Sequence, residues 1–396
     1  MLGILTLKIS TDSLMKKILF LLFLIVSLAA QSQILKDTIS SKSLQEKREI
    51  LISLPENFDK NAKKTYPLLV LMDGDYLMSP FHGALSFGNF WDDLPEMIIV
   101  GISQNKNDER FDDCIVSEEG LPEAKGARFF EFIGGEVLSY MESKYGNSPF
   151  KIIAGHDVTA GFLNFFLYKD NPLFNGYISI SPELSTNMDA NVANRLSAVQ
   201  KNIFYYLSVA DGDVKKMKEA TKILHDNISS VKNDNLYYKF DEVPNTSHYS
   251  LVLHSIPKAL YHFFATYQPI STAEFQEKIV KMESGYVEYL RNKYELCEKT
   301  LGIKVPVRIN DFRAIEAAIV KNKATNEFEQ LAQVANKYYP RTMLGEYYMA
   351  RFYEANEDFK RAAKSYQNAF TMEAIGDLTK DMMLEKADEL RTKIKK

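Results

Sequence analysis

The stretch Lys151-Ile152-Ile153-Ala154-Gly155-His156-Asp157-Val158-Thr159 decides the fold of this chain. Its apolar first half is typical of a buried strand, and the apolar residues after Thr159 suit a helix packed on a sheet. A strand that turns sharply into a helix, with small residues on both sides of one exposed side chain, is the nucleophile elbow of a hydrolase. Gly155 is the first small residue, whereas Thr159 stands in place of the second. The sequence therefore predicts an elbow with Asp157 at its tip.

Asp157 stands where hydrolases with this turn normally present a serine. Attack of a carboxylate on an ester carbonyl gives a strained mixed anhydride, so it does not replace an activated serine. Loss of the serine alone costs about a million-fold in kcat in a serine protease. Asp157 therefore argues against ordinary esterase activity.

Short apolar runs alternate with helical or loop segments on both sides of this stretch. Continuous apolar runs indicate strands that are buried on both faces, as in a parallel sheet covered by helices. The predicted fold class is α/β, with a mostly parallel central sheet. We expect strands at residues 48–54, 68–72, 97–102, 150–154, 177–180, 203–209 and 236–240, and helices at residues 127–145, 214–227 and 251–267.

The N-terminus predicts export. Met15-Lys16-Lys17 precedes an apolar stretch at residues 18–30, and Ala30-Gln31-Ser32 offers small residues for cleavage. This pattern is typical of a secretory signal peptide, and it is too short for an integral membrane span. We expect a signal peptide at residues 1–32, with residues 1–14 as a start-site extension, and a mature protein in the periplasm or at the cell surface.

Composition narrows the possible partners. The chain has 396 residues and a formal net charge of -4, so it lacks the basic excess of a nucleic-acid-binding protein. Cys114 and Cys297 are far apart in sequence, which favours two buried free thiols over a disulfide. The six histidines show no metal-ligand spacing, so we expect neither a metal site nor a cofactor.

The last third of the chain indicates a separate helical domain. We expect an α/β domain at residues 33–270 and an all-α domain at residues 271–396, which includes helices at residues 313–339 and 378–395. Small and aromatic residues there have the spacing of a tetratricopeptide helix pair; they are Ala350, Tyr353, Ala362, Tyr366 and Ala369. A short array of this kind leans on its neighbour for stability and offers a surface for an envelope protein.

An acid and a histidine follow Asp157 in the chain order of a hydrolase triad. Asp211 and Asp213 come directly after the predicted strand at residues 203–209, where either one can orient an imidazole. His248 lies in a polar loop after the strand at residues 236–240. The elbow, the acid and the histidine together predict a hydrolase-like site.

Residues 47–267 resemble the putative esterase family of α/β-hydrolases, which includes esterase D and the enterochelin esterases. The resemblance implies an α/β-hydrolase fold and a pocket for a small molecule. It is carried by Arg48 to Pro55, by Leu71-Met72-Asp73-Gly74, by Val100-Gly101-Ile102 with Arg110, and by Phe174 with Ser181-Pro182.

By position, the resemblance gives Asp157 the place of the nucleophile and His248 the place of the base. Asp213, or alternatively Asp211, takes the place of the orienting acid. The backbone N–H of Val158 and one from the loop at residues 73–76 form the oxyanion hole, which makes Gly74, Asp75 and Tyr76 candidate donors.

Two classes of function follow. The first is a degenerate esterase that binds a ligand or another protein, with Asp157 hydrogen-bonded to His248. The second is an active hydrolase of carboxylic esters or, with Asp157 as nucleophile, of epoxides or haloalkanes through an alkyl-enzyme ester that water activated by His248 cleaves. A third and least favoured hypothesis makes Thr159 or Ser181 the nucleophile.

Overall fold

The computed structural model describes residues 34–394 except 57, 61–63 and 105–107. In this part of the chain eight strands form one sheet in the order β1-β2-β4-β3-β5-β6-β7-β8. β1 and β2 are antiparallel to their neighbours, and all pairs from β4 to β8 are parallel. The predicted mostly parallel sheet is therefore confirmed. The strands are β1 (Ile34–Ser41), β2 (Glu46–Ser53), β3 (Leu68–Leu71), β4 (Ile98–Ile102), β5 (Lys151–His156), β6 (Gly176–Ile180), β7 (Ile203–Gly212) and β8 (Leu236–Ser247).

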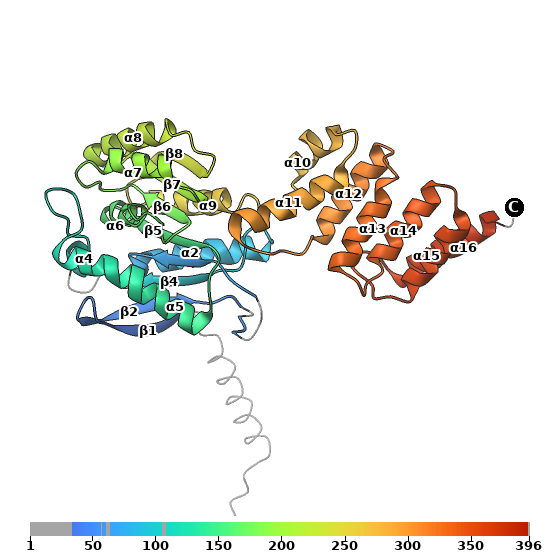
Figure 1. Ribbon diagram of the computed structural model, residues 1–396, viewed down its shortest axis with the longest axis horizontal. Helices are drawn as coiled ribbons and strands as arrows, with labels where there is room; N and C mark the ends of the chain where they lie inside the picture. Colours follow the sequence, from blue (N-terminus) through green and yellow to red (C-terminus); the bar gives the residue numbers. More distant parts are fainter. Residues whose placement is uncertain (1–33, 57, 61–63, 105–107, 395–396) are drawn as a thin grey trace, which may run out of the picture.

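Helices cover both faces of the sheet (Figure 1). Alternate strand residues belong to different apolar clusters, because successive side chains of a strand point to opposite faces; Val70 lies in one cluster, whereas Leu69 and Leu71 lie in the other. The first cluster is covered by α4 (Ala124–Glu131), α5 (Leu138–Tyr145), α7 (Met188–Ala198) and α8 (Lys215–Ser229), and the second by α2 (Gly74–Phe90) and α9 (Leu251–Phe263).

Several elements were not predicted from the sequence, and one predicted helix is divided in the structure. β1, α2 and α7 were not predicted; α2 contains Pro80 and several glycine and serine residues that weaken its helical signal. The single helix expected at residues 127–145 is interrupted by a π-helical segment at Phe132–Val137. That segment contains Gly134-Gly135, where the helix-forming tendency is lowest.

A run of helices follows the sheet and extends to one side of it in Figure 1. Within the last four helices each packs on the next. Ala350 and Tyr366 are buried in their core, as the repeat hypothesis expects, although the tetratricopeptide identity stays a prediction. The helices are α10 (Thr272–Glu277), α11 (Tyr286–Leu301), α12 (Ile309–Lys321), α13 (Glu327–Tyr338), α14 (Leu344–Ala355), α15 (Phe359–Phe370) and α16 (Lys380–Ile394).

The helical region is anchored to the sheet region by α11. Cys297 and Leu301 of this helix belong to the same apolar cluster as Phe150 and Phe263. Cys297 and Cys114 are both buried and both free, as expected. The predicted signal peptide, residues 1–32, lies outside the described residues and stays a prediction. Within residues 34–394, apart from the gaps named above, no helix is long and apolar enough to cross a membrane.

Candidate active site

The turn after β5 has the geometry of a nucleophile elbow. Asp157 has φ 64° and ψ -125° between β5 and the short helix α6 (Val158–Phe162). A positive φ in a residue other than glycine costs about 1 to 3 kcal/mol, so the surrounding structure must hold it. A Cβ atom on Gly155 would lie 2.7 Å from the backbone carbon of Thr159, which explains why the first flanking residue is glycine. The strained turn therefore persists although the serine is absent.

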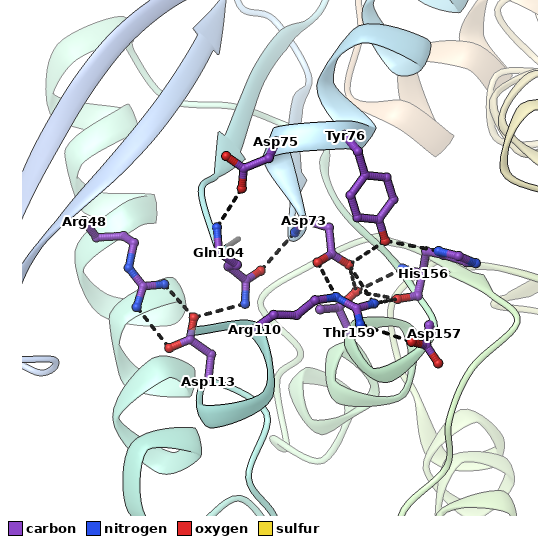
Figure 2. Close-up of polar contacts among 10 residues, drawn as sticks. All are labelled: Arg48, Asp73, Asp75, Tyr76, Gln104, Arg110, Asp113, His156, Asp157 and Thr159. Atoms are coloured by element: carbon purple, nitrogen blue, oxygen red, sulfur yellow. Dashed lines mark hydrogen bonds and ion pairs between the residues drawn. The ribbon is translucent and has the colours of Figure 1, made fainter. Parts of the chain in front are cut away.

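Arg110, on the short helix α3 (Glu109–Asp112), is the partner of the Asp157 carboxylate (Figure 2). Its Nη1 lies 3.1 Å from Oδ2 of Asp157, and its Nη2 donates to the backbone carbonyl of His156 at 2.8 Å. The Asp157 side chain is 23% exposed, and that of Arg110 13%. The hydrogen bond expected between Asp157 and His248 is not formed within the described part of the chain. Asp157 is neutralised by an arginine instead.

Asp73 holds Arg110 from the other side. Nε of Arg110 donates to Oδ1 of Asp73 at 2.6 Å, and the Thr159 hydroxyl donates to Oδ2 at 2.6 Å (Figure 2). Burial raises the pKa of Asp73, and the bonds from Arg110, Thr159 and Tyr76 only partly oppose this. Thr159 is fully buried and its hydroxyl is engaged, so it does not fit the role of nucleophile.

His156 lies beneath the elbow. Its Nδ1 is 3.1 Å from the Tyr76 hydroxyl, which itself donates to Asp73 at 2.9 Å. Nε2 of His156 is 3.2 Å from the backbone carbonyl of His248. Burial, followed by the nearby His248, lowers the pKa of His156 to about 4. His156 is therefore a neutral ring that joins α2 to the loop of His248.

His248 and Asp213 form the acid–imidazole pair that the chain order predicts. Nδ1 of His248 lies 2.8 Å from Oδ1 of Asp213. Burial alone would raise the pKa of Asp213, but hydrogen bonds from His248, from Ser181 and from two backbone N–H groups lower it to about 2. Ser181 is buried and donates to Asp213 at 2.6 Å, on the Nδ1 side of the imidazole. It therefore does not fit the role of nucleophile either.

Asp211, the alternative acid, has a different task. Its carboxylate accepts hydrogen bonds from the backbone N–H groups of Asn245 and Thr246, at 2.8 and 3.1 Å. These residues belong to the end of β8, just before His248. Asp211 therefore shapes the chain that carries the imidazole, and Asp213 contacts the imidazole itself.

The candidate oxyanion donors are only partly available. The Tyr76 N–H donates to the carbonyl of Asp73 at 3.1 Å, so it is occupied. The Asp75 side chain accepts from the Ser103 hydroxyl at 2.7 Å, which fixes the start of α2 against the end of β4. Gly74 and Val158 are the first residues of α2 and α6, where backbone N–H groups have no acceptor within their own helix. These two remain candidate donors.

A row of buried polar side chains, which sequence analysis missed, is hydrogen-bonded to Asp73 and so supports the elbow (Figure 2). Gln104 accepts from the N–H of Asp73 at 2.9 Å and donates to Asp113 at 3.1 Å. Asp113 is paired with Arg48 at 2.6 Å, with side chains 0% and 2% exposed. Gln104 lies two residues after a predicted strand, which was the available signal, because polar residues at the carboxyl ends of parallel strands line sites.

We expect Asp213→Asn to lower the pKa of His248. The hydrogen bond to Asp213 raises this pKa above the ordinary 6.5, against burial. A group with a raised folded pKa stabilises the folded state fully below pH 6.5, and this contribution is lost as the pH rises through the folded value. The measurement is an NMR titration of the His248 ring protons. Asp211→Asn is the matched control, and equal shifts in both variants would contradict the assignment of Asp213.

Comparisons with known proteins find similarity to a family of esterases in the sheet region. Residues 41–224 match the family described as putative esterase. The sequence matches no curated protein. A crystal structure of an uncharacterised protein from Capnocytophaga ochracea superposes with a TM-score of 0.82 at 29% identity and covers 91% of this chain and 100% of that one. The similarity therefore extends beyond the sheet into the helical region.

Two further solved structures share the fold. An IroE-like serine hydrolase from Shewanella oneidensis has a TM-score of 0.58 at 19% identity and covers 77% of this chain and 99% of that one. The BES protein from Bacillus cereus has a TM-score of 0.52 at 22% identity and covers 59% of this chain and 95% of that one.

Proposed function

We propose that this protein, whose residues 41–224 match the putative esterase family, is a degenerate esterase that binds an acyl compound without hydrolysing it. The observation that carries the proposal is the ion pair between Asp157 and Arg110 at the tip of the elbow. A serine hydrolase needs a nucleophile whose proton passes to histidine. Here the group at that position has no proton to give when ionised and is held by a guanidinium.

The residues around Asp157 support a functional binding site rather than an active site that has merely lost its serine. Arg110 is fixed by Asp73 and by the carbonyl of His156, so its guanidinium is held beside Asp157. Thr159 fills the place of the second small residue and donates to Asp73. Asp157 and Thr159 are the two residues that depart from the serine pattern. Hydrogen bonds connect them through Arg110 and Asp73. The imidazole of His248 stays in place through Asp213, which supports continued recognition of a ligand beside the elbow.

The experiment uses phenyl acetate as a probe. We expect it to shift the His248 ring resonances of the native protein saturably while no phenol is released above the uncatalysed rate. The reason is that Asp157, paired with Arg110, provides no serine-like route to an acyl-enzyme. Phenol release that His248→Ala abolishes would overturn the proposal.

A second candidate function rests on the intact His248–Asp213 pair, which is suited to activate water. In this reading Asp157 attacks an epoxide or haloalkane and forms an alkyl ester. The ion pair to Arg110 weakens Asp157 as a nucleophile. The Tyr76 hydroxyl, bonded to Asp73 and lying beside His156, is not free to hold the electrophile. A His248→Gln variant incubated with epoxyhexane or bromohexane would accumulate a mass adduct on Asp157 if this function were present.

A further inference from the structure

A cavity lies where the sheet region meets the helical region. Its volume is about 580 Å³, within the range of small-molecule sites, which often form at such junctions. One wall comes from the end of α2 and the turn after it, and the other from the segment that leads into α12. None of its lining residues belongs to the elbow site. We call this cavity the junction pocket.

Trp91 gives the junction pocket an open aromatic face. It is the single tryptophan of the chain, and it is 61% exposed while lining the cavity. Tryptophan is usually largely buried, so an exposed one beside a cavity is the informative exception. The adjacent Phe90 packs against it with the two rings nearly perpendicular and their centroids 5.1 Å apart.

Two of the three cations that line the junction pocket are paired, and the third, Lys304, is exposed. Arg308 pairs with Asp92 and donates to the backbone carbonyl of Tyr267 at 2.8 Å, with its guanidinium 4.5 Å from the Tyr267 ring centroid. Lys64 forms an ion pair with Glu96. A charged ligand would have to displace these pairs or rely on the exposed Lys304 alone, so the pocket favours a neutral one. Arg308, through Asp92 and Tyr267, also joins the two regions. These contacts hold this side of the pocket in place before a ligand binds.

Two side-chain amides face the pocket without protein partners. Asn89 comes from α2, and Asn310 from α12, and both line the cavity. Within the described part of the chain, neither amide group has a hydrogen bond to protein. Each offers two N–H donors and a carbonyl acceptor. The pocket therefore combines an aromatic plane with neutral groups that both donate and accept.

We propose that the junction pocket binds a neutral oligosaccharide. A pyranose has an apolar face of C–H bonds, which the negative face of an indole attracts, and a rim of hydroxyls that both donate and accept. Trp91 would stack on the sugar ring, and Asn89 and Asn310 would bond its hydroxyls from the two walls. A ligand held this way bridges the sheet and helical regions.

The single tryptophan makes the test direct. The full-length protein is titrated with cellohexaose, maltohexaose, chitohexaose and mannohexaose at up to millimolar concentrations, with Trp91 fluorescence and calorimetry as readouts. We expect saturable binding of at least one of them. Trp91→Ala and Asn310→Ala are each expected to weaken the calorimetric affinity, the former about tenfold.

Phe87→Ala is the matched control, because Phe87 is 65% exposed on the same helix and does not line the pocket. It is expected to leave the affinity unchanged. The proposal is overturned if no saccharide binds or if Trp91→Ala binds as tightly as the native protein. It is also overturned if sedimentation shows that Trp91 responds to self-association instead.

Discussion

An Asp157→Ser variant is expected to hydrolyse p-nitrophenyl acetate at least about a thousand times faster than the native protein. The reason is geometric. The turn already holds residue 157 at φ 64°, so a serine there would stand at the tip of the elbow. The His248–Asp213 pair is formed at 2.8 Å, and Val158 begins α6 as a candidate oxyanion donor. The nucleophile is the main group that is missing.

The full gain of a natural serine hydrolase, about a million-fold in kcat, is not expected. Arg110 would lose one of its anionic partners, and its guanidinium would stand beside the new hydroxyl. Thr159 also fills the space that a second small residue would leave open. Both effects displace the serine from its best position relative to His248.

Two control variants separate the possible causes of any gain. Asp157→Ala removes the same carboxylate from Arg110 but supplies no nucleophile, so it should stay as inactive as the native protein. Asp157→Ser combined with His248→Ala should lose the gained activity. An Asp157→Ser protein that is folded and no more active than Asp157→Ala would show that the ester pocket itself has been lost.

The sequence predicted the elbow well because the signal is local. One glycine, one strand and one apolar helix within twenty residues specify the turn. The choice between Asp211 and Asp213 could not be made from sequence, since both follow the same strand. In the structure the register of β7 against β8 shifts between Ala210 and Gly212. The two acids therefore have different partners, although only one residue separates them.

The partner of Asp157 could not be predicted for a different reason. Arg110 is 47 residues away in sequence and lies on a helix of four residues, too short to leave a periodic pattern. Its position depends on Asp73, which in turn is fixed by Gln104. A buried network of this kind is settled by tertiary packing, so the sequence shows its members without showing how they pair.

Replacing Arg110 by methionine is expected to lower the free energy of unfolding by about 3 to 5 kcal/mol. Arg110 is the cation that faces Asp73, whose side chain is fully buried. Without it, that carboxylate keeps, among the residues that the structure describes, only the hydroxyl donors of Thr159 and Tyr76. Breaking a buried pair is costly because the remaining charge is left uncompensated in a medium of low dielectric. The measurement is urea unfolding, with the midpoint and slope compared between variants.

Two further variants test this cause. Asp73→Asn in the Arg110→Met background should recover much of the loss, because the stranded charge is removed. Lys222→Met breaks an exposed pair with Glu242, so it should change stability by less than about 1 kcal/mol. A loss in Arg110→Met that Asp73→Asn leaves unchanged would point to lost packing of the arginine stem instead.

The stability lost in Arg110→Met is expected to depend on pH. Burial raises the pKa of Asp73 above its ordinary 3.8 even with Arg110 present, so the folded state holds this proton more tightly than the unfolded state. Stability therefore decreases as the pH rises from 3.8 through the folded value. Removal of Arg110 raises the folded pKa further. The deficit of Arg110→Met should accordingly shrink as the pH is lowered, and a deficit that stays constant with pH would show that Arg110 does not act by neutralising Asp73.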